Sequence, residues 1–262
     1  LDPVEVSVDD GAIYLEVRTT QSHVHVAMAA RTVVRLNGER VEAHVTETEE
    51  PGFVAQTFEF DVTEGVPTTV EKALTLFTSR DHAISEPGRA ARSWIWRLGS
   101  FDELLESNSL AWDLLWRRFS LDTGADDFEA MVLNLHSFHL MQTVSKHTID
   151  LDVGVPARGW HGEAYRGHIF WDELFIFPYL NLHLPDLTRA LLLYRYRRLP
   201  EARWAAKAEG FEGALYPWQS GSTGREESQV VHLNPASGRW LPDNSRLQRH
   251  INIAVAYNTW QY

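Results

Sequence analysis

The chain has 262 residues and a formal net charge of −12 at pH 7, which argues against nucleic acid or an anionic membrane surface as its partner. It contains no cysteine, which excludes a disulfide framework and a thiolate metal site and fits a cytoplasmic protein. No apolar run is long enough for a membrane span, and the first residues lack the basic and apolar regions of a signal peptide.

Alternating apolar and polar residues predict short β-strands over roughly the first 80 residues. Clear examples of this period-two pattern are residues 13–17, 24–28 and 41–45. Asn37-Gly38 is a favourable hairpin turn between two of the expected strands. Many short strands in succession predict an antiparallel β-sandwich or part of one. His23 and His25 would share a strand face, but two histidines alone seldom bind a metal, so we expect no metal site.

Helical patterns begin after this region. Ser100 to Glu103 has the form of a capping box, in which the serine caps the helix and the glutamate reaches back, and it predicts a long linker helix from Phe101 to Phe119. Asp126-Asp127 opens a second amphipathic helix. His136 and His139 lie three residues apart on it, and a packed pair is favoured over a metal site because no third ligand stands nearby.

Four further helices are expected in the rest of the chain. They cover residues 172–182, which include Pro178, then about 185–198, 200–209 with Gly210 as the C-terminal cap, and a last helix from about 247 to 262. Residues 231–249 are interpreted as irregular. We expect a mostly solvated face from the arginines near the end of the second of these helices: Arg189, Arg195, Arg197 and Arg198.

The stretch most suggestive of function is residues 158–173, which read RGWHGEAYRGHIFWDE. Its glycines predict a loop that runs into a helix. Aromatic rings beside carboxylates and arginines suit a sugar site, because rings cover the apolar face of a pyranose and charged groups bind its hydroxyls. A buried loop that packs its own aromatics is the alternative.

A second loop, at residues 213–228, offers Trp218, Gln219 and the charged residues 225–227 to a ligand. The run Ser220 to Gly224 could cradle an anion through backbone N–H groups, but a flexible surface loop is the favoured interpretation. The common nucleotide-binding, serine-hydrolase and zinc-protease motifs do not occur in the chain.

Four passages carry a family resemblance, and they read TVEKALTLFTSRD (69–81), GEAYRGHIFWDELFIFPYL (162–180), LLLYRYRRLPEARWAAKAEGFEGALYPWQSGSTGREE (191–227) and HINIAVAYNTWQY (250–262). With them the chain resembles the glycoside hydrolase family 65 phosphorylases, which act on maltose, trehalose, kojibiose and related disaccharides. The resemblance implies an α+β multidomain protein: a β-sandwich portion at 1–85, a helical linker at 86–122, and a partial (α/α)6 catalytic barrel at 123–262.

The resemblance also implies roles for individual residues. Asp172 would accept hydrogen bonds from the hydroxyls of the transferred sugar, unless it only caps the following helix, and Trp171 would form a wall of the same pocket. The general acid is expected beyond Tyr262, and inorganic phosphate is expected as co-substrate with no cofactor. Further substrate-binding residues would be Tyr165, His168, Trp218 and Gln219.

Other interpretations remain open at this point. The chain could belong to an α-glucoside hydrolase of the acid trehalase type, or to a catalytically inactive carbohydrate-binding protein. Activity of residues 1–262 alone would make Glu163 or Glu173 the candidate proton donor. The chain lacks an initiator Met and its last helix has no cap, so we expect a piece of a longer protein. An incomplete barrel would expose an apolar helical face, which predicts a homodimer or other self-association.

Overall fold

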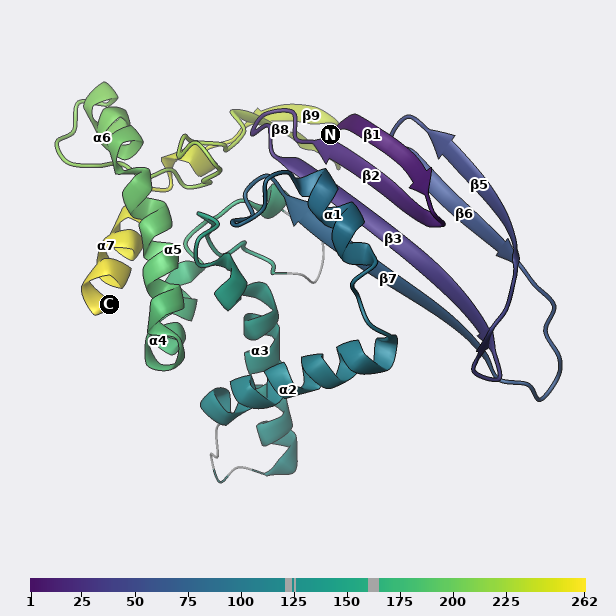
Figure 1. The fold of residues 1–262 in the computed structure, drawn as a ribbon. Helices are drawn as coiled ribbons and strands as arrows, with labels where there is room; N and C mark the ends of the chain where they lie inside the picture. The colour runs from purple at the N-terminus through teal and green to yellow at the C-terminus, as the bar shows by residue number, and fades with distance from the viewer. Residues whose placement is uncertain (121–123, 125, 160–164) are drawn as a thin grey trace. The chain divides into compact units, whose positions relative to one another are not determined.

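The computed structural model describes residues 1–120, 124, 126–159 and 165–262 (Figure 1). The chain divides into two compact units, Leu1–Leu114 and Leu115–Tyr262. The first unit contains an antiparallel sheet, and the second consists mainly of helices joined by loops. The predicted class, an N-terminal antiparallel sheet followed by helices, is therefore confirmed.

The main sheet of the first unit has five strands, all paired antiparallel. Its order is β1-β2-β3-β4, with β7 pairing on the other edge of β3. The predicted turn at Asn37-Gly38 is confirmed, because both residues have positive φ (49° and 85°), as a tight hairpin turn of this kind requires. The strands are β1 (Asp2–Asp9), β2 (Ala12–Arg18), β3 (His25–Leu36), β4 (Glu39–Arg40) and β7 (Thr68–Thr78).

A separate hairpin, β5 (His44–Glu50) and β6 (Phe53–Glu59), lies against β1 and β2. The Val8 backbone N–H donates to Glu49 Oε1 at 3.1 Å across this contact. The second layer of the expected sandwich is thus only two strands. The strand predicted over 41–45 is wrong in its first half. The chain leaves the main sheet after the short β4, and pairing in the hairpin starts only at His44.

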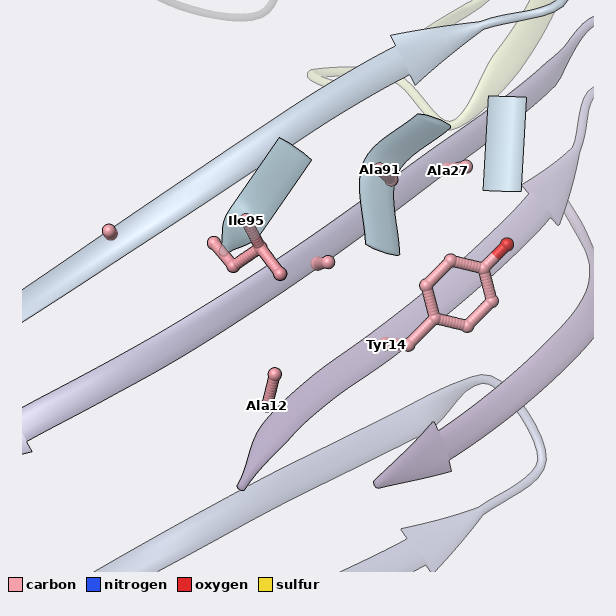
Figure 2. Close-up of a cluster of buried hydrophobic side chains, with 7 residues drawn as sticks. Ala12, Tyr14, Ala27, Ala91 and Ile95 are labelled. Carbon is pink, nitrogen blue, oxygen red and sulfur yellow. The ribbon is translucent and has the colours of Figure 1, made fainter. Parts of the chain in front are cut away.

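The core of the first unit lies between the sheet and helix α1 (Pro87–Ile95) (Figure 2). Small side chains let the helix approach the strands closely. Larger apolar residues on the opposite sheet face are less buried, and Leu74 and Leu76 each remain 52% exposed. The core residues are Ala12, Tyr14, Ala27, Ala29, Ala73, Ala91 and Ile95.

Helices α2 (Phe101–Phe119) and α3 (Asp127–Thr143) start where the sequence predicts them. The capping box is present, since the Ser100 backbone N–H donates to Glu103 Oε2 at 2.8 Å. This backbone bond, together with a 3.1 Å bond from the Ser100 hydroxyl, lowers the pKa of Glu103. The end of α2 is held inside the second unit, where His183 Nδ1 donates to the Arg118 carbonyl at 2.7 Å.

The remaining helices are α4 (Glu173–His183), α5 (Pro185–Arg197), α6 (Leu199–Ala208) and α7 (Ile251–Gln261), with short 3-10 turns at Lys146–Thr148, Tyr165–Gly167 and Ser245–Leu247. Helix α4 continues through Pro178, and it packs against α5 and α7. None of the helices in the described part of the chain combines the length and apolarity needed to cross a membrane.

One prediction for this unit is wrong: residues 231–249 are not wholly irregular. Strands β8 (Val231–Asn234) and β9 (Arg239–Pro242) pair as a hairpin. Asn234 makes the reversal possible, because its Oδ1 accepts the backbone N–H groups of Ala236 and Ser237 at 3.0 and 3.2 Å. Gly238 then adopts a positive φ of 64° before β9 begins.

Candidate functional site

Two loops that are distant in sequence meet in the second unit. Ile169 and Ser220 exchange backbone hydrogen bonds of 3.0 and 2.9 Å, which joins the segment before α4 to the loop after α6. Beside this bridge, Gln219 Nε2 lies 2.7 Å from His168 Nδ1. His168 and Gln219, which were predicted separately as substrate-binding residues, are therefore in direct contact.

An aromatic cluster surrounds this junction. Trp218 lies edge-on to Phe170, with ring centroids 5.5 Å apart, and its centroid is 6.1 Å from that of Trp171. Tyr165 contacts Phe170 at 5.1 Å and remains 59% exposed at the rim. The predicted lining residues Tyr165, Trp171 and Trp218 thus come together around Phe170.

His250, which precedes α7, joins the same cluster, although it was not among the predicted site residues. Its ring centroid lies 4.6 Å from that of Trp171 and 4.9 Å from that of Trp218. The available signal was its place at the start of the 250–262 passage that carries the resemblance. A mainly apolar pocket of about 510 Å³ opens beside Trp171 and His250, and its other lining residues are Leu174, Pro178, Ile253, Ala254 and Tyr257.

Asp172 occupies the N-cap position of α4, but its side chain makes no capping hydrogen bond to the helix. Its backbone is already helical (φ −55°, ψ −26°), whereas a capping residue normally has extended φ and ψ. Burial raises the pKa of the Asp172 carboxyl. The carboxylate therefore sits next to Trp171 at a cost in solvation and without a role in capping.

Glu173, in contrast, is buried and held in an ion pair. It is 3% exposed and pairs with Arg195, which is 2% exposed, through a 3.1 Å bond from Nε to Oε2. Burial raises the pKa of Glu173, and Arg195 opposes that shift. Arg195 Nη2 also donates to the Phe170 carbonyl at 2.7 Å.

The expected solvated arginine face is wrong for Arg195 and Arg198, which are both buried. The end of α5 faces loops whose carbonyls and carboxylates need donors. Arg198 binds Asp152 through both terminal nitrogens, at 3.0 and 3.1 Å, and donates to the Ser222 carbonyl at 2.8 Å. Burial alone would raise the pKa of Asp152, but its bonds from Arg198 and Arg197 outweigh this and lower it.

Residues 220–224 were expected to form a flexible surface loop; Ser222 and Thr223 are exposed, but the two ends of the run are buried. Ser220 is 1% exposed, and its hydroxyl lies 2.8 Å from the Tyr194 hydroxyl. The Gly221 carbonyl accepts from Tyr194 at 2.6 Å, so carbonyl groups of this loop face donors on α5. Those contacts offer no support for an anion cradle here.

The Glu226 carboxylate binds backbone N–H groups of its own loop, residues 213–228. Its Oε2 accepts the Trp218 backbone N–H at 2.7 Å, and its Oε1 accepts that of Gln219 at 3.1 Å. The residue was a candidate ligand by sequence, and the structure uses it to position two predicted lining residues. Glu163 lies outside the described residues. Among those described, no group of three or more His, Asp or Glu side chains is placed to hold a metal ion.

Comparison with known proteins gives a consistent result. An uncharacterized glycosyl hydrolase of Mycobacterium tuberculosis is 45% identical over 262 residues, which is 100% of this chain and 20% of that protein. A trehalose 6-phosphate phosphorylase of Lactococcus lactis is 35% identical over 252 residues, covering 95% of this chain and 32% of that protein. A kojibiose phosphorylase of Halothermothrix orenii is 29% identical over 270 residues, covering 97% and 34%.

The fold is also shared with a solved structure, of a protein from the human microbiome assigned as a kojibiose phosphorylase. The TM-score is 0.75 at 18% identity, over 100% of this chain and 32% of that one. The chain thus spans about a third or less of the length of these relatives. The model of the glycosyl hydrolase family 65 N-terminal domain matches residues 1–115, and that of the family's central catalytic domain matches residues 134–262. The chain belongs to glycosyl hydrolase family 65.

Proposed function

We propose that the complete protein is an inverting phosphorylase that cleaves an α-glucosidic bond of a disaccharide with inorganic phosphate. The observation that carries the proposal is Asp172, a half-buried carboxylate with a raised pKa and no capping bond, set beside the ring of Trp171. The names of the relatives support the reaction type, since they include trehalose 6-phosphate, kojibiose and 1,2-α-glucosylglycerol phosphorylases.

In this proposal Asp172 accepts hydrogen bonds from hydroxyls of the glucosyl group that is transferred, and Trp171 covers its apolar face. Such contacts can strengthen as the sugar approaches its oxocarbenium-like transition state. The substrate-binding surface continues over Trp218 and Tyr165 and over the His168–Gln219 pair.

The reaction forms a bond between a phosphate oxygen and the anomeric carbon and breaks the bond to the leaving oxygen, which takes a proton from a general acid. We place that acid beyond Tyr262. Glu173 is an unsuitable donor, because it is buried and bound to Arg195. Phosphate is the only small molecule besides the disaccharide that the proposal requires.

Product analysis tests this function. The complete protein is incubated with maltose, trehalose, trehalose 6-phosphate or kojibiose, with and without phosphate, and both glucose 1-phosphate and free glucose are measured. We expect glucose 1-phosphate from one substrate only when phosphate is present, and none from residues 1–262 alone. Free glucose formed without phosphate would identify a hydrolase. Sugar binding with no turnover at all would identify an inactive carbohydrate-binding protein.

We further propose a cytoplasmic location and self-association of residues 1–262. Several large apolar side chains on α4 and α7 are exposed, among them Leu182 (82%), Ile253 (73%) and Trp260 (77%). Exposed apolar area of this kind marks contact surfaces. Light scattering checks the second proposal, and a clean monomer that binds no hydrophobic dye would contradict it.

A further inference from the structure

Arg195 binds on both sides of the Trp171-Asp172 pair. Its Nη2 donates to the carbonyl of Phe170, the residue before the pair, at 2.7 Å. Its Nε donates to the carboxylate of Glu173, the residue after the pair, at 3.1 Å. A single guanidinium from α5 therefore spans the two residues proposed to contact the sugar, without touching the pocket itself.

The backbone of the pair is fixed at the same place. The Trp171 carbonyl accepts the Leu174 N–H at 2.8 Å, and the Asp172 carbonyl accepts the Phe175 N–H at 3.0 Å, so both belong to the first turn of α4. The orientation of that turn relative to the Ile169–Ser220 bridge depends on the side chain that binds residues 170 and 173. In the structure that is Arg195, which is itself 2% exposed.

A purely stabilising role does not account for this arrangement. Replacing a buried ion pair by apolar residues of similar volume is often neutral or stabilising, so stability alone does not require the pair. Moreover, the second bond of the guanidinium goes to a main-chain carbonyl in the substrate loop. The planar fork of arginine fixes the angle between its two acceptors, which a lysine ammonium does not do.

We propose that Arg195 is a positioning residue: by binding Phe170 and Glu173 together it sets the place and orientation of Trp171 and Asp172 in the sugar subsite. This inference rests on the function proposed above. It acts through Asp172 and not on the substrate. Misplacement of a substrate-binding group by about 1 Å can lower turnover by about 100-fold.

The test uses four variants of the complete protein. Arg195→Met removes the guanidinium but leaves Glu173 buried without its partner, and this protein can fail to fold. The double variant Glu173→Leu/Arg195→Met removes both charges and should recover the stability that the single variant loses. Arg195→Lys keeps the charge without the fork. Arg197→Met is the matched control, because Arg197 is the exposed neighbour that binds Asp152 at 3.0 Å.

Three experiments are performed on each variant: thermal unfolding, amide hydrogen exchange in the peptide covering residues 168–176, and steady-state kinetics that give kcat and KM for the disaccharide. We expect the double variant to keep a near-native midpoint, with exchange in that peptide accelerated by about tenfold or more. Its kcat should fall by about 100-fold, more than KM changes. Arg195→Lys should recover little of the rate, and Arg197→Met should resemble the wild type.

Two results would overturn the proposal. The first is a double variant that regains full kcat together with its stability, since Arg195 would then serve folding only. The second is exchange in residues 168–176 that is no faster than in Arg197→Met. Should the wild type release no glucose 1-phosphate, the proposed function fails by itself, and hydrogen exchange still decides whether Arg195 holds the segment.

Discussion

Both units bury a glutamate side chain, and they treat it differently. In the first unit, Glu16 (6% exposed) accepts from the Tyr14 hydroxyl at 2.5 Å and from His25 Nδ1 at 2.6 Å. In the second unit, Glu173 (3% exposed) is bound by the guanidinium of Arg195. Each cluster supplies hydrogen-bond donors to a carboxylate that would be costly to bury alone.

The cluster around Glu16 fastens α1 to the sheet. Arg92 of the helix lies over the Tyr14 ring, 3.5 Å from its centroid, and Thr75 Oγ1 donates to the Ala91 carbonyl at 2.9 Å. Burial raises the pKa of Tyr14, and its bond to Glu16 adds to the shift, so the phenol remains a donor. The polar groups of the Glu16 cluster therefore form contacts within the fold.

The cluster around Glu173 differs because a second carboxyl group lies directly beside it. Asp172 is adjacent in sequence, and burial raises its pKa, yet it makes no capping bond. A group kept at such a cost in solvation is a better candidate for binding than one already held in a buried ion pair. The comparison indicates that the buried carboxylate paired with Arg195 supports the fold, while the carboxylate of Asp172 beside it is available to a ligand.

The largest effect is expected from Asp172→Asn in the complete protein. Loss of a preorganised charged partner should lower kcat/KM by about 10² to 10³-fold. Stability should move the other way. Because the folded-state pKa is raised, the carboxyl stabilises the fold at low pH, and that stability is lost as pH rises through the folded pKa. The variant should thus unfold at higher urea than wild type near neutral pH, with the gap closing below about pH 4.

The matched substitution in the first unit is Glu16→Ala. It removes the partner of Tyr14 and His25, so we expect it to lower the free energy of unfolding by about 1–3 kcal/mol. Sugar affinity should stay within about twofold once the protein is folded. A large stability loss for Asp172→Asn, or a large affinity loss for Glu16→Ala, would remove the distinction between the two clusters.

A smaller effect is expected from adding one methyl group to either cluster. A Cβ at Gly88 would lie 2.2 Å from the Tyr14 hydroxyl, and one at Gly154 would lie 2.5 Å from Ile169 Cδ1 and 3.1 Å from Glu173 Oε1. Overpacking of this kind costs about 1–3 kcal/mol, so both alanine variants should be destabilised in urea titrations. Only Gly154→Ala should also lower kcat, since it displaces the residues that flank Trp171-Asp172.

Equal kinetic effects of the two glycine variants would contradict this view of the second cluster. Gly88→Ala is the control for general destabilisation, because the added carbon and the resulting strain are of the same kind. Comparing kcat at temperatures well below both unfolding midpoints separates the local displacement from loss of folded protein.

Several features of the molecule follow from local sequence rules. The bounds of α2 are as predicted, because Ser100 and Glu103 form their capping box within one turn. The Asn37-Gly38 turn depends only on which residues tolerate positive φ. Trp171 and Asp172 were identified through the resemblance of the passage around them, and their roles in binding remain predictions.

Features that depend on distant contacts were missed for a physical reason. Arg195 and Arg198 follow a pattern typical of a solvated helix end, and their burial becomes evident only when residues 168–173 and 220–222 present acceptors to them. His250 contacts Trp171 although the two residues lie far apart in the chain. The alanine-rich face of the first sheet is buried because α1 covers it, which no period-two pattern specifies.

The smallest effect is expected on the pH dependence of stability and comes from a histidine. One histidine in each unit contacts a polar side chain, and the two side chains differ in charge. His25 faces the Glu16 carboxylate, whereas His168 Nδ1 faces the amide of Gln219 at 2.7 Å and can accept its N–H only while that nitrogen is unprotonated. Burial, with a contribution from Arg166, lowers the pKa of His168.

The sign of the pH effect follows from that shift. A histidine whose folded pKa is depressed contributes stability that is complete above its unfolded pKa of about 6.5 and is lost as pH falls toward the folded value. Between about pH 7 and pH 5 the second unit of the wild type should therefore lose more stability than that of His168→Gln. We expect a difference below about 1 kcal/mol, because the ring is partly exposed and solvent screens its charge. Urea unfolding followed by tryptophan fluorescence at both pH values measures it. Parallel losses in the two proteins would show that the contact between His168 and Gln219 does not depend on the protonation state of the ring.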